Sequence, residues 1–558
     1  MDLGLPRVRL GGAVAETSHT RLGAAAVPGR QLAGITAVGT LLLLVLAVRM
    51  RGLPGGGPVA YDEGWGLSNG RFEVALLTHP QQWASVLHGH GHVFLFGLSW
   101  KVGHDLTLGS LLAAGVAPEY LTLYSFLAGV VMVTVLAALA WRRWGAPAAA
   151  TAGVFAGAMP LSIVYGHRIL PEADGLAALV LGLLLLDRWW AARPSRALAT
   201  LTVFTFLVTL SFNYRLLPTV LPIVLLLGWL GWRYRHGPPP RAVTGRLLVL
   251  CLIPAFAIVA VYLVVLAAGV TNLPHLPALL QRQFIRSSAG APLPFASPDF
   301  YLRTFWDYGG PAFVVTGALG SIACLWGWKK LDPTAALAIG SLAGTLLFFS
   351  AVHDKAPRAV VVCVPFAALV VARAVTLPRN KVLQWTAALT ICGACLITGW
   401  TGSGFALEES GTGQAGRWLA THPGLIVATR APVFVAYTER SWDVSPGLDP
   451  TTRIVKARRD STVASLRQEG ARWVVVDAHS LLFGESPIFK QLIACGRPAA
   501  EFSDAADWSP LQFLEDADNL HVGYDATTVI RAQVLAAGKG RETIRIYDLS
   551  GPGTAQCG

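Results

Sequence analysis

The sequence predicts a polytopic α-helical membrane protein that carries a small C-terminal α/β domain outside the membrane. Charged residues make up 14% of the 558 residues, hydrophobic residues make up 53%, and the mean hydropathy is +0.52. A soluble globular protein carries about a quarter charged residues, so this composition favours a chain that lies largely in a bilayer. The apolar residues also gather in long runs, the last of which ends at residue 402.

Eleven apolar runs are long enough, or nearly so, to cross a membrane. A helix of about 20 apolar residues spans a hydrocarbon core of roughly 30 Å. The runs lie at 31–49, 119–141, 147–165, 172–190, 198–212, 216–232, 247–269, 311–328, 334–351, 359–377 and 382–402. The segment 91–103 is too short and contains Lys101, so we expect it to form a helix at the outer interface.

The positions of Lys and Arg predict the orientation, because cytoplasmic loops are enriched in them. The tail at 1–30 carries four Arg, and every second connection after it is basic, as in "WRRWG", "DRWWAARPSR" and "WKKLDP". We therefore expect the tail in the cytoplasm of a bacterium, and the loop at 50–118 and residues 403–558 outside. The tail is too long for a typical cleaved signal peptide. The net charge of +12 is mainly this orientation signal, so nucleic acid is not an expected partner.

Residues 403–558 predict a separate extracytoplasmic α/β domain. The β-rich runs "LIVAT", "PVFVAY", "RWVVVDA" and "ETIRIYDL" alternate with the helical candidates "STVASLRQEG" and "PIFKQLIACG". Five of the seven cysteines lie in apolar runs, where they act as small hydrophobes, the C-x-x-C at Cys392 and Cys395 included. Cys495 and Cys557 are the two in the outer domain, and an oxidising compartment permits them to pair.

Ionisable residues gather on the side that this topology places outside. Such residues are costly next to apolar spans and are usually functional. Carboxylates can act as a general base, histidine can ligate a metal or bind a phosphate, and Arg or Lys can hold a phosphate. These are the groups needed to displace a phosphate from a sugar C1. They are Asp62, Glu63, His88, His90, His92, His167, Arg168, Glu172, Asp174, Arg215, His353, Lys355 and Arg358.

Simpler explanations exist for the acids. A carboxylate at a helix N-terminus is stabilised by about 0.3–1 kcal/mol through the helix dipole, which alone could account for Glu172 and Asp174. Asp62 and Glu63 could be solvated loop residues. Glu172 and Asp174 are two residues apart, so they point in different directions from a helix and only one of them can face a central cavity.

The order of these motifs resembles the C-type membrane glycosyltransferases that use polyprenyl-phosphate sugars. The resemblance is notably to the protein O-mannosyltransferase and lipid A aminoarabinose transferase group, of bacterial family 39 type. "YDEGW" resembles the acidic motif of the first outer loop, and "HGHGHVFLFGLSWKVG" resembles the interfacial helix that follows it. "HRILPEADGLAALVLGLLLL" and "HDKAPRAVVVCVPFAALVVARA" are similar to two later motifs with Arg, Lys and acidic residues.

The resemblance implies a C-type glycosyltransferase fold and an inverting transfer of a sugar from a polyprenyl-phosphate donor to an acceptor outside the cytoplasmic membrane. Asp62 would be the catalytic base, Glu63 would assist it, and Glu172 or Asp174 would complete the acidic site. The residues expected at the donor phosphate are His90, Arg168, Arg215, Lys355 and Arg358. The expected partners are the lipid-linked donor, membrane lipid and an acceptor that is a protein, a lipid or a glycan.

A divalent metal ion (Mg²⁺, Mn²⁺ or Zn²⁺) is an open part of this prediction. Its candidate ligands are Asp62, His88, His90 and His92.

Two other functions compete with sugar transfer. A transporter or lipid flippase usually carries polar groups at mid-membrane, whereas here the spans are nearly charge-free in their middles. No phosphate-binding P-loop motif is present, so ATP-driven transport has no support within the chain. A catalytically inactive relative whose outer domain recruits partners is the other alternative, and the Asp62–Glu63 pair counts against it.

Overall fold

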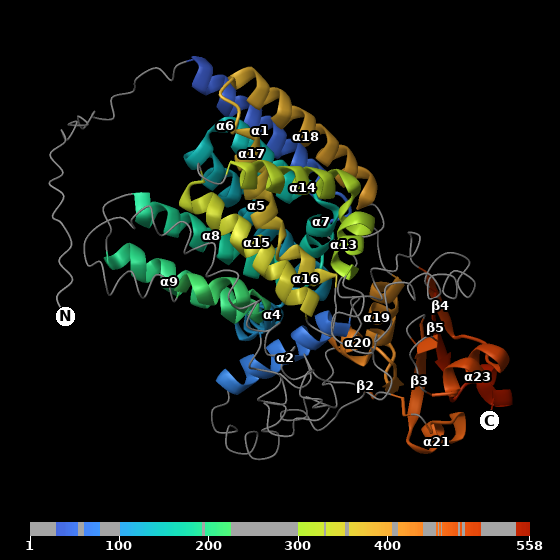
Figure 1. Ribbon diagram of the computed structural model, residues 1–558. Helices are drawn as coiled ribbons and strands as arrows, with labels where there is room; N and C mark the ends of the chain where they lie inside the picture. The colour runs from blue at the N-terminus through green and yellow to red at the C-terminus, as the bar shows by residue number, and fades with distance from the viewer. Residues whose placement is uncertain are drawn as a thin grey trace, which may run out of the picture.

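A bundle of helices joins a small sheet domain at one end (Figure 1). The computed structural model describes residues 29–53, 61–78, 101–191, 196–224, 299–327, 331–351, 357–403, 411–438, 454–455, 457–458, 460–477, 480–481, 486–503 and 543–557. The histidines at 88–92, Lys355 and the predicted span at 247–269 lie outside these residues. We call the end of the bundle against which the C-terminal domain packs the domain-side end.

Nine of the predicted apolar runs form helices in the described residues, and a tenth, at 216–232, is helical over its described part, 217–224. The bundle contains α1 (Gly29–Arg49), η2 (Pro118–Tyr120), α5 (Leu121–Trp144), α6 (Ala146–Ala158), α7 (Pro160–Gly166), α8 (Glu172–Ala191), α9 (Arg196–Phe212), η3 (Tyr214–Leu216), α13 (Phe300–Thr304), η5 (Phe305–Gly309), α14 (Pro311–Trp326), α15 (Pro333–Ala351), α16 (Arg358–Val361), α17 (Val364–Val375) and α18 (Lys381–Gly402). Within the described part, four helices are long and apolar enough to cross a membrane, or five if one bent pair counts as a single span. The total of eleven stays a prediction.

The apolar run at 147–165 was predicted as one span, but it does not form one straight helix. It bends by 62° between α6 and α7, where Met159 is extended and Pro160 starts the second helix. Proline has no N–H and disfavours a helical residue before it, so the backbone hydrogen bonding is interrupted here. Arg49 of α1 fills the break, because its Nη1 donates to Gly157 O at 3.2 Å, Ser162 O at 3.3 Å and Ser162 Oγ at 3.2 Å.

Small residues let the helices approach closely around α6. A Cβ atom added at Gly399 of α18 would lie 2.1 Å from the Ala158 carbonyl oxygen, and one at Gly157 would lie 2.4 Å from Val45. Close approach of backbones at small residues is the usual way in which membrane helices pack. The break between α6 and α7 is thus held from two sides, by α1 and by α18.

In its described residues, the predicted first outer loop at 50–118 contains the helices α2 (Tyr61–Thr78) and α4 (Val102–Ala113). They cross at glycines, since a Cβ at Gly70 would lie 2.1 Å from Asp105 O and one at Gly109 would lie 2.0 Å from Gly70 O. α2 begins at the acidic motif and lies beside the C-terminal domain (Figure 1). The interfacial helix expected at 91–103 falls almost wholly outside the described residues.

The C-terminal domain is an α/β structure built on one mixed sheet. Its strands run in the order β2-β1-β3-β5-β4, with β1 parallel to β2 and β3 and with β5 antiparallel to β3 and β4. The elements are α19 (Gly411–Thr421), β1 (Leu425–Val427), α20 (Ala431–Thr438), β2 (Ile454–Val455), α21 (Val463–Gln468), β3 (Ala471–Val476), α23 (Ile488–Cys495), β4 (Ala500–Ser503), β5 (Thr543–Asp548) and η9 (Pro552–Cys557).

One secondary-structure prediction in this domain is wrong. The run "PVFVAY" was expected to be a strand, and it lies in helix α20. A short run that is apolar on every side does not distinguish a buried strand from a buried helix. Phe434, Val435 and Ala436 are all buried, because α20 is enclosed by the sheet domain on one side and the bundle on the other.

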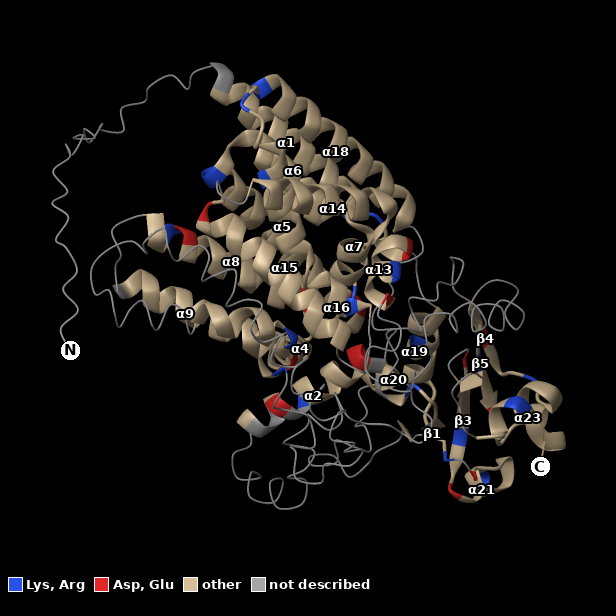
Figure 2. Ribbon diagram, viewed as in Figure 1, with Lys and Arg blue, Asp and Glu red and all other residues tan. Residues whose placement is uncertain are grey.

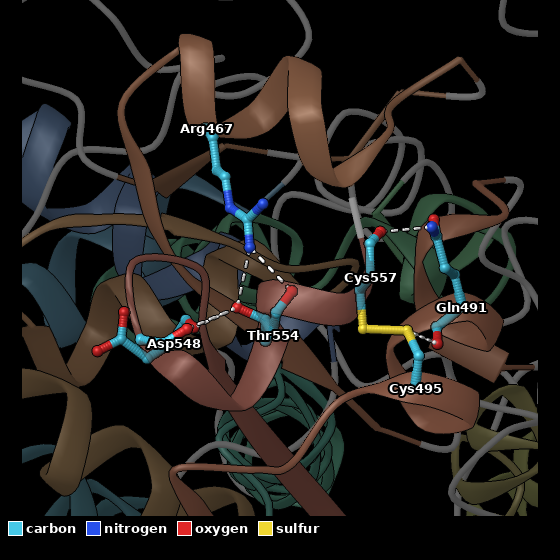
Figure 3. The surroundings of a disulfide bond; sticks show 7 residues. Arg467, Gln491, Cys495, Asp548, Thr554 and Cys557 are labelled. Atoms are coloured by element: carbon cyan, nitrogen blue, oxygen red, sulfur yellow. Dashed lines mark hydrogen bonds between the residues drawn. A yellow bond between two sulfur atoms is a disulfide. The ribbon is translucent and has the colours of Figure 1, made fainter.

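Cys495 and Cys557 form a disulfide, which confirms the pairing that the sequence permitted (Figure 3). The bond joins α23 to η9 at the end of the chain. Hydrogen bonds support the same segment, since Gln491 Nε2 donates to Cys557 O at 2.6 Å and Arg467 Nη2 donates to Thr554 O at 2.9 Å.

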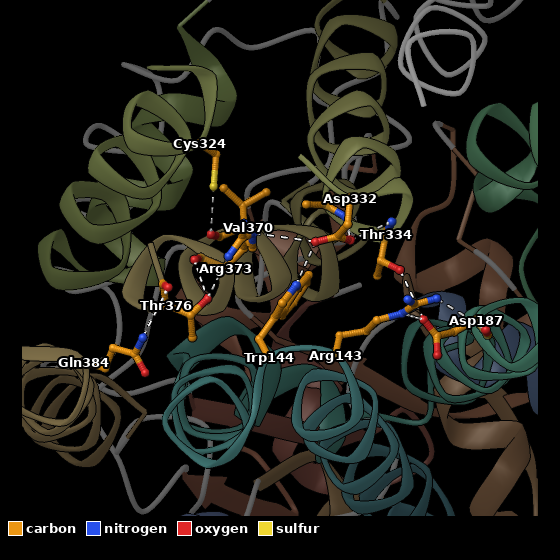
Figure 4. Close-up of polar contacts among 11 residues, drawn as sticks. Arg143, Trp144, Asp187, Cys324, Asp332, Thr334, Val370, Arg373, Thr376 and Gln384 are labelled. Carbon is orange, nitrogen blue, oxygen red and sulfur yellow. Dashed lines mark hydrogen bonds and ion pairs between the residues drawn. The ribbon is translucent and has the colours of Figure 1, made fainter. Parts of the chain in front are cut away.

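A polar network lies at the end of the bundle away from the C-terminal domain, and Figure 4 shows its contacts. Asp187, near the end of α8, is fully buried and pairs with Arg142 Nε at 2.9 Å and with Arg143, and Thr334 Oγ1 donates to it at 3.2 Å. Trp144 Nε1 donates to Asp332 Oδ2 at 2.8 Å. Charged residues thus gather toward the two ends of the bundle, as Figure 2 shows.

Candidate active site

The four predicted carboxylates lie at the domain-side end of the bundle, in the first turns of two helices. Asp62 and Glu63 begin α2, and Glu172 and Asp174 begin α8 after Pro171. Acids are favourable at helix N-termini, which explains why both helices start there. Each carboxylate also has its own partner among residues distant in the sequence.

Asp62 pairs with Arg358, the first residue of α16. The Asp62 side chain is 25% exposed and that of Arg358 is 8% exposed. Burial acts to raise the pKa of Asp62, but three nearby cations outweigh it and lower that pKa to about 2. The three are Arg358, Lys101 and Arg215.

Glu63 points away from solvent. Its Oε1 accepts from Ile169 N at 2.7 Å, and its Oε2 lies 3.5 Å from Arg168 Nη1. The side chain is fully buried, so Glu63 fixes the turn between α7 and α8 to the start of α2. Arg168, predicted at the donor phosphate, lies beside Glu63 with 12% of its side chain exposed.

Glu172 and Asp174 face different partners, as their spacing predicted. Glu172 Oε1 accepts from Arg215 Nη1 at 3.0 Å. Asp174 Oδ2 lies 2.7 Å from His104 Nδ1 and accepts from Tyr124 Oη at 2.8 Å. Both acids are buried, and Glu172 is the one that joins the cations around Asp62 through Arg215.

Comparison with solved structures identifies the fold. The match to the crystal structure of ArnT from Cupriavidus metallidurans bound to undecaprenyl phosphate covers 94% of this chain and 100% of that chain, with a TM-score of 0.50 and 13% identity. The chain has the fold of ArnT. The apo structure of the same protein matches with a TM-score of 0.49 and 14% identity, covering 94% of this chain and 99% of that chain. No family model matches the chain, and neither does any curated protein.

The match to ArnT confirms the membrane fold that the sequence resemblance implied. The likeness to ArnT extends over the bundle and the C-terminal domain together, since nearly all of both chains is covered. At 13% identity it establishes the fold, and the roles of individual residues are argued from the geometry of this chain.

Several polar residues at this end were missed in the sequence. His104 and Asp105 of α4 are fully buried, and the "KVGHD" stretch that holds them and Lys101 is the signal that could have drawn attention to them. The Asp174 carboxylate raises the pKa of His104 against the opposing effect of burial. The contact between His104 and Asp174 ties α4 to α8.

Glu73 is the second residue that the sequence did not reveal. It lies about three turns after Asp62 on α2 with 3% exposure, and neither of its carboxylate oxygens has a hydrogen-bond partner among the described residues. Burial, with the charge of Asp105, raises the pKa of Glu73 to about 9. Glu73 is therefore protonated at neutral pH.

The metal prediction depends on residues that the structure does not describe. His88, His90 and His92 lie in the gap between α2 and α4, so Asp62 alone of the candidate ligands can be placed. Within the described part of the chain, no three His, Cys, Asp or Glu side chains come together as a metal site would require. Lys355, expected at the donor phosphate with His90, also lies outside that part.

Proposed function

We propose that this protein transfers a sugar from a polyprenyl-phosphate donor to an acceptor on the outer side of the cytoplasmic membrane, with Asp62 as the general base. The observation that carries the proposal is the exposure of Asp62 among its neighbours. Its side chain is 25% exposed, whereas Glu63 and Glu172 are fully buried and Asp174 is 5% exposed. Of the four candidate carboxylates, Asp62 is the one that an acceptor hydroxyl could reach.

The surrounding charges suit a phosphate leaving group. Arg358, Arg215 and Lys101 act together on Asp62, so a bound phosphate at this place would meet three cations. Guanidinium groups bind phosphate in bidentate fashion, and cations held at the leaving group stabilise the charge that develops there. A donor phosphate would also share the charge of Arg358 and so make Asp62 more basic when substrate is bound.

The proposed reaction follows from these positions. Asp62 takes the proton of the acceptor hydroxyl, whose oxygen attacks C1 of the sugar while the C1–O bond to the lipid phosphate breaks. Attack from the face opposite the phosphate inverts the configuration at C1. The ArnT structure that shares this fold was solved with undecaprenyl phosphate bound, which supports a polyprenyl phosphate as the leaving group.

The aromatic residues support the proposed placement in a membrane. Trp400, 52% exposed, lies near the end of α18 with the Arg51 guanidinium 4.0 Å from its ring centroid, and Trp326, 89% exposed, ends α14. α14 and α18 run in opposite directions in the predicted topology, so these two tryptophans fall at opposite interfaces, where Trp is enriched. The disulfide of the C-terminal domain agrees with an oxidising outer compartment.

Asp62→Asn tests the proposal. We expect sugar transfer by the purified protein to fall by about 10²–10⁴-fold, the usual range for loss of a general base, with expression and thermal unfolding little changed. Asp460→Asn, an exposed aspartate of the C-terminal domain, is the matched control and should keep full activity. Transfer by Asp62→Asn at the wild-type rate would contradict the assignment. The donor for the assay comes from profiling lipid-linked sugars in a deletion strain, where the unused donor accumulates.

A further inference from the structure

We propose that Arg71 is a positioning residue through which the C-terminal domain holds helix α2, and with it Asp62, in the geometry needed for transfer. This inference rests on the proposed function. Arg71 lies on α2, and its guanidinium donates from Nη1 to Val435 O at 2.9 Å and from Nη2 to Ala436 O at 3.0 Å. Both carbonyls belong to α20 of the C-terminal domain, 364 and 365 residues away in the sequence.

The two carbonyls lie in the last turn of α20. The last four carbonyl groups of a helix have no partner within the helix, and that end carries the negative pole of the helix dipole. A guanidinium can donate two parallel N–H groups to these carbonyls and also places a positive charge at the negative pole of the helix. A compact ammonium group does so less well. Arg71 therefore makes a directed contact with the C-terminal domain, which a general surface charge would not make.

Apolar contacts reinforce the same interface. Trp65 of α2 packs against the apolar core of the C-terminal domain, to which Ala431 and Phe434 of α20 belong. On the bundle side of this interface, Ala436 of α20 packs in a cluster with Leu67 of α2 and with Leu121 and Ile169 of the bundle. α2 is thus enclosed between the bundle and α20 along the turns that directly follow Asp62.

α20 is itself fixed to the sheet. Arg430, just before it, donates from Nε to Asp477 Oδ2 at 2.8 Å, with the two side chains 6% and 1% exposed. Asp477 follows β3, and its Oδ1 accepts from Ser480 N at 2.7 Å. A Cβ at Gly416 of α19 would lie 2.3 Å from the Tyr437 ring, so α19 and α20 pack closely. A continuous set of contacts therefore runs from β3 through α20 to α2.

Arg71 acts on the reaction through the helix. It lies nine residues after Asp62, which is about 13 Å along a helix at 1.5 Å per residue. Asp62 meets Arg358 at one end of α2, and Arg71 meets α20 further along the same helix. A tilt of α2 would shift the Asp62 carboxylate, and a misplacement of about 1 Å can cost about 10²-fold in rate.

Steady-state kinetics of Arg71→Ala test this role. We expect kcat, measured per folded molecule, to fall by about 10- to 100-fold while KM for the lipid-linked donor changes less than about twofold. Arg71→Lys should recover part of the loss, because an ammonium can donate to the same carbonyls. Arg472→Ala, on an exposed arginine of β3 that lies 4.0 Å from Asp548, is the control and should match the wild type.

Amide hydrogen exchange gives a readout that does not depend on catalysis. In Arg71→Ala the amides of α2 should exchange faster, while those of α5 and α8 keep their protection. Unchanged kcat in Arg71→Ala, or unchanged exchange in α2, would overturn the inference. If the wild type transfers no sugar from any accumulated donor, the proposed function fails, and the exchange result still decides whether Arg71 fixes α2.

Discussion

Asp62 and Glu63 are neighbours in the sequence, yet the fold places them in different surroundings. Asp62 is partly exposed beside Arg358, and Glu63 is fully buried against the Ile169 amide and Arg168. The sequence predicted that acids and cations would meet at one end, because each lies next to the end of an apolar run. It could not predict which acid pairs with which cation, since the partners lie far apart in the sequence, 43 positions for Glu172 and Arg215 and more than a hundred for the partners of Asp62 and Glu63.

Burial of the Glu73 carboxyl group makes the stability of the protein depend on pH. Folding raises the pKa of the Glu73 carboxyl group from 4.5 to about 9. The protein therefore unfolds more easily as pH increases, because the unfolded chain loses this proton at a lower pH than the folded chain does. Stability attributable to this proton is full below pH 4.5 and is lost progressively up to about pH 9. The cost at pH 7 is on the order of 3 kcal/mol.

We therefore expect Glu73→Gln to raise the thermal unfolding temperature at pH 7–8 and to change it little near pH 4.5. The measurement is thermal unfolding of the detergent-solubilised protein across this pH range. Glu501→Gln, on a half-exposed acid of β4, is the control. A wild type that is as stable as Glu73→Gln at every pH would show that Glu73 is not protonated in the folded protein.

At the element scale, the sequence predicted the membrane helices better than the helices around the site. Hydropathy finds a long apolar run whatever its packing, but it did not reveal the bend at Pro160 within the run at 147–165. No helix was predicted at α2, where Gly64, Gly66 and Gly70 weaken helix propensity. The glycine at 70 is explained by α4, whose backbone passes too close for a side chain.

The bend between α6 and α7 makes its own prediction. Arg49→Met removes the hydrogen bonds that its guanidinium donates to Gly157, Ser162 O and Ser162 Oγ, and leaves buried carbonyls without that donor. We expect a loss of about 2–4 kcal/mol of stability, since the three hydrogen bonds share one donor atom, Nη1, and a hydrogen bond to a charged group contributes about 1.5–3 kcal/mol. Thermal unfolding in detergent measures it.

The matched control is Arg51→Met, two residues further along. Arg51 is partly exposed and makes one hydrogen bond to Trp400 O at 2.7 Å, so its loss should cost about 1 kcal/mol or less. Equal effects of the two substitutions would contradict the role given to Arg49 at the break.

At the scale of the whole molecule, the proposed chemistry requires that the C-terminal domain and the start of α2 lie on one side of the membrane and the Asp187 network on the other. α8 spans this distance, with Glu172 at its first turn and Asp187 near its last. The overall fold could be anticipated from the order of motifs, and the likeness to ArnT confirms it. The packing of the C-terminal domain on α2 could not be anticipated, because it depends on Trp65, Arg71 and the helix formed by "PVFVAY".

Cysteine labelling in intact cells tests this topology. A cysteine at Thr421, exposed on the C-terminal domain, should react with an impermeant thiol reagent added outside. A cysteine at Gly145, between α5 and α6, should be shielded until the membrane is permeabilised. The opposite pattern would invert the molecule and remove the proposed active site from the outer side.

The central claim is that Asp62 removes the acceptor proton while the cations beside it hold the departing lipid phosphate. The most direct measurement is a single turnover, with purified protein preloaded with its polyprenyl-phosphate sugar and then mixed with acceptor. Wild-type protein should release one polyprenyl phosphate for each sugar transferred. Asp62→Asn should bind the donor equally well and release almost none on the same timescale. Release by Asp62→Asn at the wild-type rate would contradict the account.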